Sequence, residues 1–442
     1  MSRFRDNWPA YPAALVAGLM LVACADEDTG PQFATDPRPT LPATEAALPA
    51  ASPPPALLPT TVPVATPASF TDLLNVRGAV STVFVPTDSD VWSISSDGKA
   101  TRLFVAPDGA SIRVIDPAPN AQEVAVLLET ATDAQPTFQV VTVDIAGSVL
   151  ARIDVPAPAT APARATPVAQ DGEGRPTIDW SPQGDRVLAQ IQATDVVEID
   201  PDGARGPMPL DFGDAAGSVI APEWSPTGQS IAFISESEDG ETRSLNLLDT
   251  TNGEISTIVR PIAGRLVVDF TWLPDGVSLL FTEGGGPDNA TTGIDLWRID
   301  ANGENRALVA SAGTVAPVAR ITNLSPSPDG RSVAYTVLVP GSRGPVVDSV
   351  WVRSLVSGVG FRIPLPSVGS VQDIWWTDVG IVISVVTSGT AQGRSPTEAL
   401  LEVKRDGSIA ALWAAPLAVG TPRNATPAAG SGPTQPSAAG TG

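Results

Sequence analysis

The chain has 442 residues, and its 45 prolines and 39 glycines are far more turn-forming residues than a helical protein tolerates. The formal net charge of −22 argues against nucleic-acid binding, which depends on clustered Lys and Arg. Histidine is absent, which removes the usual general base near neutral pH and the commonest ligand of transition metals. The composition therefore favours a β protein with many turns and without a nucleic-acid partner.

Residues 1–23 have the pattern of a secretory signal peptide. Arg3 and Arg5 supply positive charge, residues 13–23 form a short apolar run, and the only cysteine of the chain, Cys24, follows. The run is shorter than the roughly 20 residues that a membrane-spanning helix needs. The segment resembles the lipobox of bacterial lipoproteins. That resemblance implies cleavage before Cys24, lipid attachment to its thiol, and a protein anchored to the bacterial cell membrane on its extracytoplasmic side.

Residues 24–69 are dominated by Pro, Ala and Thr. Such a composition buries too little apolar surface to offset the entropy lost on ordering, so we expect a disordered linker between the lipidated Cys24 and a folded domain. Residues 420–442 have the same character and are expected to form a disordered tail. The folded domain is therefore expected between residues 70 and 419.

Two features recur within this domain. The first is a pentapeptide followed at once by an apolar strand, and it reads WSPQG at 180–184, WSPTG at 224–228, WLPDG at 272–276, PSPDG at 326–330 and WTDVG at 376–380. In these pentapeptides Pro suits the second position of a type I turn and Gly its last, so the segment predicts a turn between two strands. The preceding Trp is expected to pack between neighbouring repeats.

The second feature is a hairpin whose turn ends in glycine. Seven such hairpins follow one another at intervals of 49 to 56 residues, with turn glycines at Gly98, Gly147, Gly203, Gly253, Gly303, Gly358 and Gly407. Seven units of about fifty residues, each with about four short strands, are typical of a β-propeller.

Together the two features resemble the TolB-like (WD40-like) propeller repeats, over about 345 residues. The likeness is strongest in the four units that start near residues 180, 224, 272 and 326, and the unit at 117–121 reads PAPNA in place of the pentapeptide. The resemblance implies an all-β fold, a propeller of seven four-stranded blades, with six blades as the alternative.

In a four-stranded blade, the pentapeptide turns and the glycine hairpins share one face of the disc, and the long irregular loops share the other. Variable loops on a rigid scaffold are the usual place for recognition. We therefore expect a binding face on the long-loop side, with the candidate residues Glu236, Glu238, Asp239, Glu241, Asp288, Arg343 and Arg394.

The expected function is binding or scaffolding of a protein, a peptide or an envelope polymer, with the membrane contacted through the lipid anchor alone. The sequence has no G-x-S-x-G motif and no histidine for a catalytic triad, so we expect no enzyme, no catalytic residue, no cofactor and no metal. The alternative is a hydrolase or lyase that uses carboxylates, with calcium bound by the acidic loop at 236–241. A sensor or assembly factor outside the cytoplasm is a third hypothesis.

Overall fold

The computed structural model describes residues 70–416, apart from 75, 77, 133–134, 157–175, 193–194, 214–217, 238, 261, 263, 286–292, 317, 342–343, 366–369 and 388–396. The described residues form 27 β-strands, one short helix, α1 (Phe70–Leu74), and one 3-10 turn, η1 (Ala312–Thr314), so the predicted all-β class is confirmed. No helix in the described part of the chain is long and apolar enough to cross a membrane. The predicted signal peptide, Cys24, the linker and the tail lie outside these residues.

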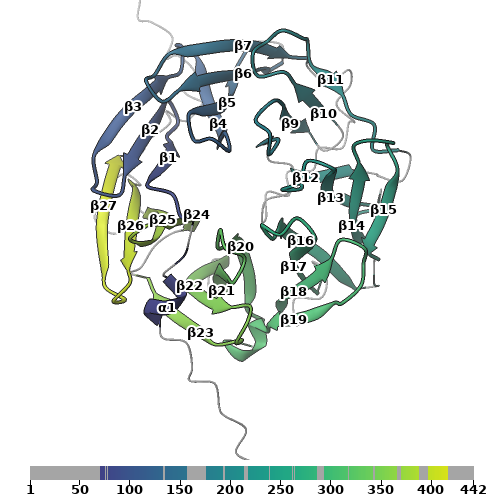
Figure 1. The fold of residues 1–442 in the computed structure, drawn as a ribbon, viewed down its shortest axis with the longest axis vertical. Helices are drawn as coiled ribbons and strands as arrows, with labels where there is room; N and C mark the ends of the chain where they lie inside the picture. Colours follow the sequence, from purple (N-terminus) through teal and green to yellow (C-terminus); the bar gives the residue numbers. More distant parts are fainter. Residues whose placement is uncertain are drawn as a thin grey trace, which may run out of the picture. The chain divides into compact units, whose positions relative to one another are not determined.

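Strands that follow one another in the chain pair in antiparallel groups (Figure 1). The first group has three strands: β1 (Thr82–Pro86), β2 (Asp90–Ser95) and β3 (Ala100–Val105). The second is β4 (Ala110–Pro117), β5 (Glu123–Thr130), β6 (Thr137–Asp144) and β7 (Val149–Val155), and the third is β8 (Thr177–Trp180), β9 (Val187–Gln192), β10 (Asp195–Ile199) and β11 (Met208–Pro209). The fourth is β12 (Ser218–Trp224), β13 (Ser230–Glu236), β14 (Arg243–Asp249) and β15 (Ile255–Val259).

Three further groups follow. The fifth is β16 (Arg265–Trp272), β17 (Ser278–Gly285), β18 (Ile294–Asp300) and β19 (Ala307–Ala310). The sixth is β20 (Arg320–Pro326), β21 (Ser332–Gly341), β22 (Gly344–Ser354) and β23 (Gly360–Pro364), and a single parallel pair, Ile294 with Arg320, joins it to the fifth. The last is β24 (Ser370–Thr377), β25 (Gly380–Thr387), β26 (Thr397–Lys404) and β27 (Ile409–Pro416).

The innermost strands of successive groups contact one another, β4 with β8, β8 with β12, β16 with β20, and β20 with β24, and a hydrogen bond from Trp272 to Glu223 joins β16 to β12. Repeated four-stranded sheets of this kind, set around a common centre, have the architecture of a β-propeller (Figure 1). The blade count and the way in which a ring closes stay predictions, because the first group has only three strands among the described residues.

Both recurring sequence features form the turns that were predicted. In the pentapeptides the glycine N–H donates to the carbonyl three residues back, as from Gly184 to Ser181 at 2.9 Å and from Gly228 to Ser225 at 2.8 Å. All seven hairpin glycines have positive φ, between 71° and 89°, which L-residues rarely adopt. WTDVG differs: β24 and β25 pair from Thr377 to Gly380, so only two residues form the turn between them.

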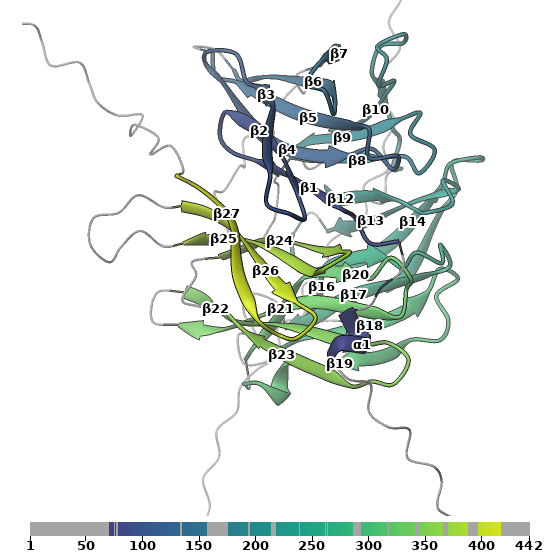
Figure 2. The same ribbon diagram turned by 60° about the vertical axis from the view of Figure 1, so that its left-hand side comes forward.

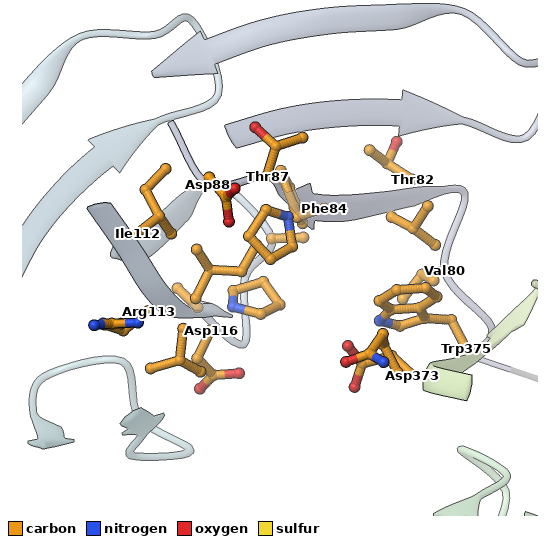
Figure 3. Close-up of a pocket in the computed structure, with 18 of the residues that line it drawn as sticks. Val80, Thr82, Phe84, Thr87, Asp88, Ile112, Arg113, Asp116, Asp373 and Trp375 are labelled. Carbon is orange, nitrogen blue, oxygen red and sulfur yellow. The ribbon is translucent and has the colours of Figure 1, made fainter. Parts of the chain in front are cut away.

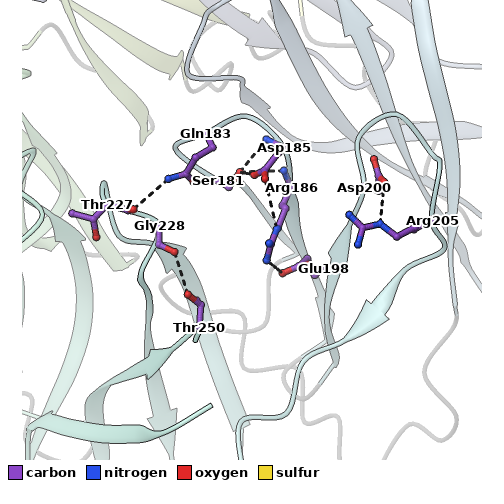
Figure 4. A network of polar contacts seen from close by, with 10 residues as sticks. All are labelled: Ser181, Gln183, Asp185, Arg186, Glu198, Asp200, Arg205, Thr227, Gly228 and Thr250. Carbon is purple, nitrogen blue, oxygen red and sulfur yellow. Dashed lines mark hydrogen bonds and ion pairs between the residues drawn. The ribbon is translucent and has the colours of Figure 1, made fainter. Parts of the chain in front are cut away.

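The tryptophans of the pentapeptides lie between groups, as predicted. Trp180 belongs to the same buried cluster as Ala125 and Leu127 of the second group, and Trp272 to the same cluster as Ala232 and Ile234 of the fourth. Neighbouring turns also touch, since the Gln183 side-chain amide donates to the Thr227 carbonyl at 3.2 Å (Figure 4). Each pentapeptide therefore links its own group to the preceding or the following one.

Helix α1 lies beside the sixth group in both ribbon views (Figures 1 and 2). Phe70 meets Phe361 of β23 edge to face, with ring centroids 5.5 Å apart, and Leu74 is fully buried. From α1 the chain crosses the end of β24, where the Val80 N–H donates to the Trp376 carbonyl at 3.0 Å, and then enters β1. The start of the described chain is therefore attached to the last two groups.

Candidate functional site

The described part of the predicted binding face is a well-bonded loop. Glu236 ends β13 and forms an ion pair of 2.8 Å with Arg243, which begins β14. In the turn between them, the Asp239 carboxylate accepts hydrogen bonds from the Ser237 hydroxyl at 2.6 Å and the Glu241 N–H at 3.0 Å. These bonds hold the pKa of Asp239 below its ordinary value. The side chains of Glu236 and Asp239 thus stabilise the turn.

The other candidates from the sequence, Glu238, Asp288, Arg343 and Arg394, lie outside the described residues, so whether they form one face with Glu236 stays a prediction. Within the described residues, no three acidic side chains are grouped in a way that would hold a metal ion. Calcium binding therefore remains an untested alternative.

A different set of acidic side chains recurs on the innermost strands. Asp116 of β4 accepts a hydrogen bond of 2.8 Å from the backbone N–H of Trp180, and Asp179 of β8 accepts one of 2.6 Å from the N–H of Trp224. Glu223 of β12 likewise accepts a hydrogen bond of 3.4 Å from the backbone N–H of Trp272. A carboxylate on one innermost strand thus links to the backbone of the next.

Two further carboxylates continue this series. Asp269 of β16 accepts hydrogen bonds from the backbone of Asn323 and Leu324 in β20, and Asp373 lies on β24. We call Asp116, Asp179, Glu223, Asp269 and Asp373 the inner carboxylates. Four of these residues are half-buried, and Asp373 is exposed.

Desolvation by the surrounding protein raises the pKa of every inner carboxylate. It raises the pKa of Asp116 to about 7 and the pKa of Glu223 to about 8, with a further increase from neighbouring carboxylates. It raises the pKa of Asp269 to about 6. Desolvation also raises the pKa values of Asp179 and Asp373, and the negative charges of Asp116 and Glu223 raise the pKa of Asp179 further. Asp116, Glu223 and Asp269 therefore exchange protons between about pH 6 and pH 8.

The first group departs from the pattern. Its glycine hairpin at Gly98 joins β2 to β3, whereas the hairpins at Gly147, Gly203 and Gly253 join the third and fourth strands of their groups. In later groups, the second strand contacts the first strand of the next group, as β5 contacts β8 and β9 contacts β12. β1 contacts β4 in the same way. β1 therefore occupies the second position of its group, and no described residues form an innermost strand there.

The neighbouring strands fit this interpretation. β4 ends with Pro117, which has no N–H, at the position where β8, β12 and β16 end with a tryptophan that bonds to the preceding strand. On the other side, β24 carries Trp375 at the position where β4, β8 and β12 carry a carboxylate. β4 therefore lacks the tryptophan N–H of this link, whereas β24 does carry a carboxylate, Asp373, which lies three residues before Trp376 as Asp269 lies three residues before Trp272.

A cavity of about 650 Å³ lies where the innermost strand of the first group would run (Figure 3). Thr82, Val83, Phe84 and Pro86 of β1 line one side of it. The other walls come from β4 and β24, with Ile112, Arg113, Val114, Asp116, Gln372, Asp373 and Trp375. We call this space the central cavity, and Figure 3 shows Asp116 and Asp373 toward the same end of it.

The central cavity is acidic on balance. Asp88, Asp116 and Asp373 line it, and the charge of Asp116 is close enough to be affected by that of Asp373. Its one arginine, Arg113, is paired with Glu129 of β5 and is thereby neutralised. Apolar walls with several carboxylates suit a ligand that carries positive charge together with apolar groups.

Sequence reasoning missed this site and selected the long loops instead. A signal was present, because an acid directly precedes the pentapeptide tryptophan in Asp179-Trp180 and in Glu223-Trp224. A further signal was present in the first unit, because no pentapeptide precedes its glycine hairpin at Gly98, whereas in other units the pentapeptide joins the first two strands.

No family model matches the chain, and no curated protein matches it. Among solved structures, it is similar to TolB from Acinetobacter baumannii, with 14% identity over 67% of each chain and a TM-score of 0.41. It is also similar to an oligogalacturonate lyase from Vibrio parahaemolyticus (11% identity, 75% of this chain and 85% of the lyase, TM-score 0.47). A puromycin-hydrolysing peptidase of Mycobacterium tuberculosis matches with 16% identity, 79% of this chain, 55% of the peptidase and a TM-score of 0.48.

The chain spans about half the length of the peptidases that it matches. These similarities are too low to support any statement about activity or partners. The propeller architecture therefore rests on the strand topology described above.

Proposed function

We propose that this protein is a binding module, anchored to the membrane through Cys24 and facing the extracytoplasmic side, that takes up a cationic segment of a protein or peptide in the central cavity. We take its propeller to have seven blades, because the seven glycine hairpins recur at one position of every group. The observation that carries the proposal is the central cavity itself, since it combines apolar walls with Asp116 and Asp373 and its single arginine is already paired.

Charge supports a cationic partner. With a net charge of −22, the molecule attracts cations from a distance, and the carboxylates of a partly enclosed cavity are screened by salt less than those on an open surface. Because the pKa of Asp116 is raised to about 7, its deprotonation makes the central cavity more negative as the pH rises. Affinity for a cation should therefore increase between pH 5.5 and pH 8.5.

The test is a titration with a fluorescent peptide of alternating Lys and Val, followed by anisotropy at several pH values. Asp373→Asn removes a charge from the central cavity, and we expect it to weaken binding about 3- to 10-fold, as for one partly desolvated charge pair. Glu241→Gln removes the same charge from the long-loop face and is the matched control. If Glu241→Gln weakened binding and Asp373→Asn did not, the site would lie on the long loops.

The membrane anchor has a separate test, which does not depend on the ligand. In a bacterial host that processes lipoproteins, the wild-type chain should fractionate with membranes, whereas Cys24→Ser should not be lipidated. A Cys24→Ser protein that is still processed and retained as before would contradict the anchor and leave the central cavity unaffected.

A second candidate function is a carboxylate-dependent hydrolase or lyase. It is favoured by the pKa values of Asp116 and Glu223, because a carboxyl group that is partly protonated near neutral pH can act as a general acid. Cleavage of an envelope polysaccharide that is lost in both Asp116→Asn and Glu223→Gln, and retained in Glu241→Gln, would favour this function over binding alone.

A further inference from the structure

One edge of β1 has no strand partner among the described residues. In the first group the order is β1, β2, β3, so β1 lies at the edge, whereas the second strands of the other groups each lie between two strands. The side chains of β1 are nevertheless those of a core strand, with Val83, Phe84 and Val85 buried. An edge strand with a buried core is a ready template for pairing with another extended chain.

The direction of the unpaired groups follows from the hydrogen bonds around β1. Just before β1, the Ser81 carbonyl accepts from the Ser96 N–H at 2.9 Å, and just after it the Thr87 N–H donates to the Asp90 carbonyl at 2.7 Å. Because bonded residues alternate along an antiparallel ladder, Val83 and Val85 bond to β2, and Thr82 and Phe84 direct their N–H and C=O groups the other way.

That free edge faces the central cavity. The cavity is lined by Thr82, Val83, Phe84 and Pro86 of β1, and most of its other lining comes from the innermost strands β4 and β24 and the turn after β4. Pro86 lacks an N–H but its carbonyl remains an acceptor, which is how proline is tolerated at a strand edge. The cavity thus offers two donors and three acceptors in a row, beside the carboxylates of Asp116 and Asp373.

We propose that an extended peptide with alternating cationic and apolar side chains binds here by strand addition, pairing with β1 as the fourth, innermost strand of the first group. This inference rests on the proposed function and specifies how binding occurs. The innermost strands of the other groups have four to eight residues, so a peptide of about six residues fits the position. Backbone pairing with β1 supplies affinity, and Asp116 and Asp373 select positive charge.

The first experiment separates backbone pairing from charge. The full-length protein is titrated with the Lys/Val peptide, with the same peptide N-methylated at alternate residues, and with spermine, which carries charge but no peptide groups. Strand addition predicts that methylation in one of the two registers weakens binding at least 10-fold and that spermine binds weakly. Equal binding of all three would overturn strand addition and retain the proposed function, whereas no binding of any would overturn both.

The second experiment changes the free edge. Thr82→Pro removes one donor that β2 does not use, so the β1–β2 pairing is kept, and Thr82→Val is the matched control because it retains the N–H. We expect Thr82→Pro to weaken peptide binding about 2- to 10-fold, as for the loss of one hydrogen bond, and Thr82→Val to bind as the wild type does. A thermal melt of both variants identifies a folding defect. A folded Thr82→Pro protein with full affinity would contradict pairing at this edge.

Hydrogen exchange gives a readout that does not require a substitution. In the free full-length protein, the N–H groups of Thr82 and Phe84 should exchange much faster than those of Val83 and Val85, and the peptide should slow them at least 10-fold. If Thr82 and Phe84 were already protected without peptide, a segment of this chain would occupy the edge, and the proposal of an external peptide would be wrong.

Discussion

At the scale of single residues, positive backbone φ explains the spacing of glycine along the chain. In the pentapeptide at 180–184, Gly184 has a φ of 72°, and the nearest atom to an added Cβ is Cδ of Pro119 at 4.0 Å. At the corresponding turn of the second group, Ala121 adopts a φ of 54° and its N–H donates to the Ala118 carbonyl at 2.8 Å. The same turn thus exists with and without glycine.

These two turns provide a reciprocal test. Gly184→Ala should lower the free energy of unfolding by about 1 kcal/mol, because an L-residue is strained at this φ and no contact is added. Ala121→Gly should raise the free energy of unfolding by about 0.5–1 kcal/mol through relief of strain. The greater conformational freedom of glycine in the unfolded chain offsets part of this gain. Urea unfolding followed by tryptophan fluorescence measures both. A stabilising Gly184→Ala would show that the turn relaxes on substitution.

Serine in the pentapeptide has a role that the turn pattern did not predict. The Ser181 hydroxyl accepts from the N–H groups of Asp185 at 3.2 Å and Arg186 at 3.1 Å, and Ser225 and Ser327 bond in the same way to the N–H groups of Ser230 and Ser332. The hydroxyl therefore satisfies backbone donors within the turn, which accounts for its recurrence beside proline.

At the scale of elements, tryptophan connects one innermost strand to the preceding one. The Trp180 indole Nε1 donates to the Asp116 carbonyl at 3.0 Å, in addition to the bond from the Trp180 backbone to the Asp116 carboxylate. The Trp224 indole is equally buried, but its Nε1 has no partner among the described residues. The two tryptophans therefore differ in one hydrogen bond while sharing a position in the repeat.

This difference predicts the result of a matched pair of substitutions. Trp180→Phe should cost about 1 kcal/mol more than Trp224→Phe, because only the first removes a hydrogen bond between groups. Trp180→Ala and Trp224→Ala should each cost about 3–5 kcal/mol, since both leave a large cavity. Urea unfolding followed by circular dichroism avoids the change in fluorescence. Equal costs for the two Phe variants would show that the indole hydrogen bond contributes little.

At the scale of the whole molecule, the inner carboxylates link stability to pH. Their pKa values are raised in the folded state, so the folded protein holds protons that the unfolded chain has already released. Stability should therefore fall as the pH rises from about 4, the ordinary carboxyl pKa, to about 8, the pKa of Glu223.

The urea midpoint should accordingly be lower at pH 8.5 than at pH 5. In the double variant Asp116→Asn and Glu223→Gln, the urea midpoint should change less with pH, because neither amide titrates. Both amide oxygens can still accept the hydrogen bond from the tryptophan N–H. Asp239→Asn is the control: its pKa is lowered, so its effect belongs to the acid side, below pH 4. A double variant with an unchanged slope would place the pH dependence elsewhere.

The sequence by itself determined the all-β class, the repeat, and the positions of the turns, because glycine, proline and tryptophan act through local geometry and through burial that recurs at a fixed interval. It pointed to the long loops for binding, since loop length is visible in a sequence. Only the tertiary structure decided that β1 is the second strand of its group, and that Asp116 of β4 and Asp373 of β24, far apart in the chain, face one cavity. The physical reason is that an unpaired strand edge and a raised carboxylate pKa both depend on which distant segments surround a residue, and that information is not contained in its neighbours along the chain.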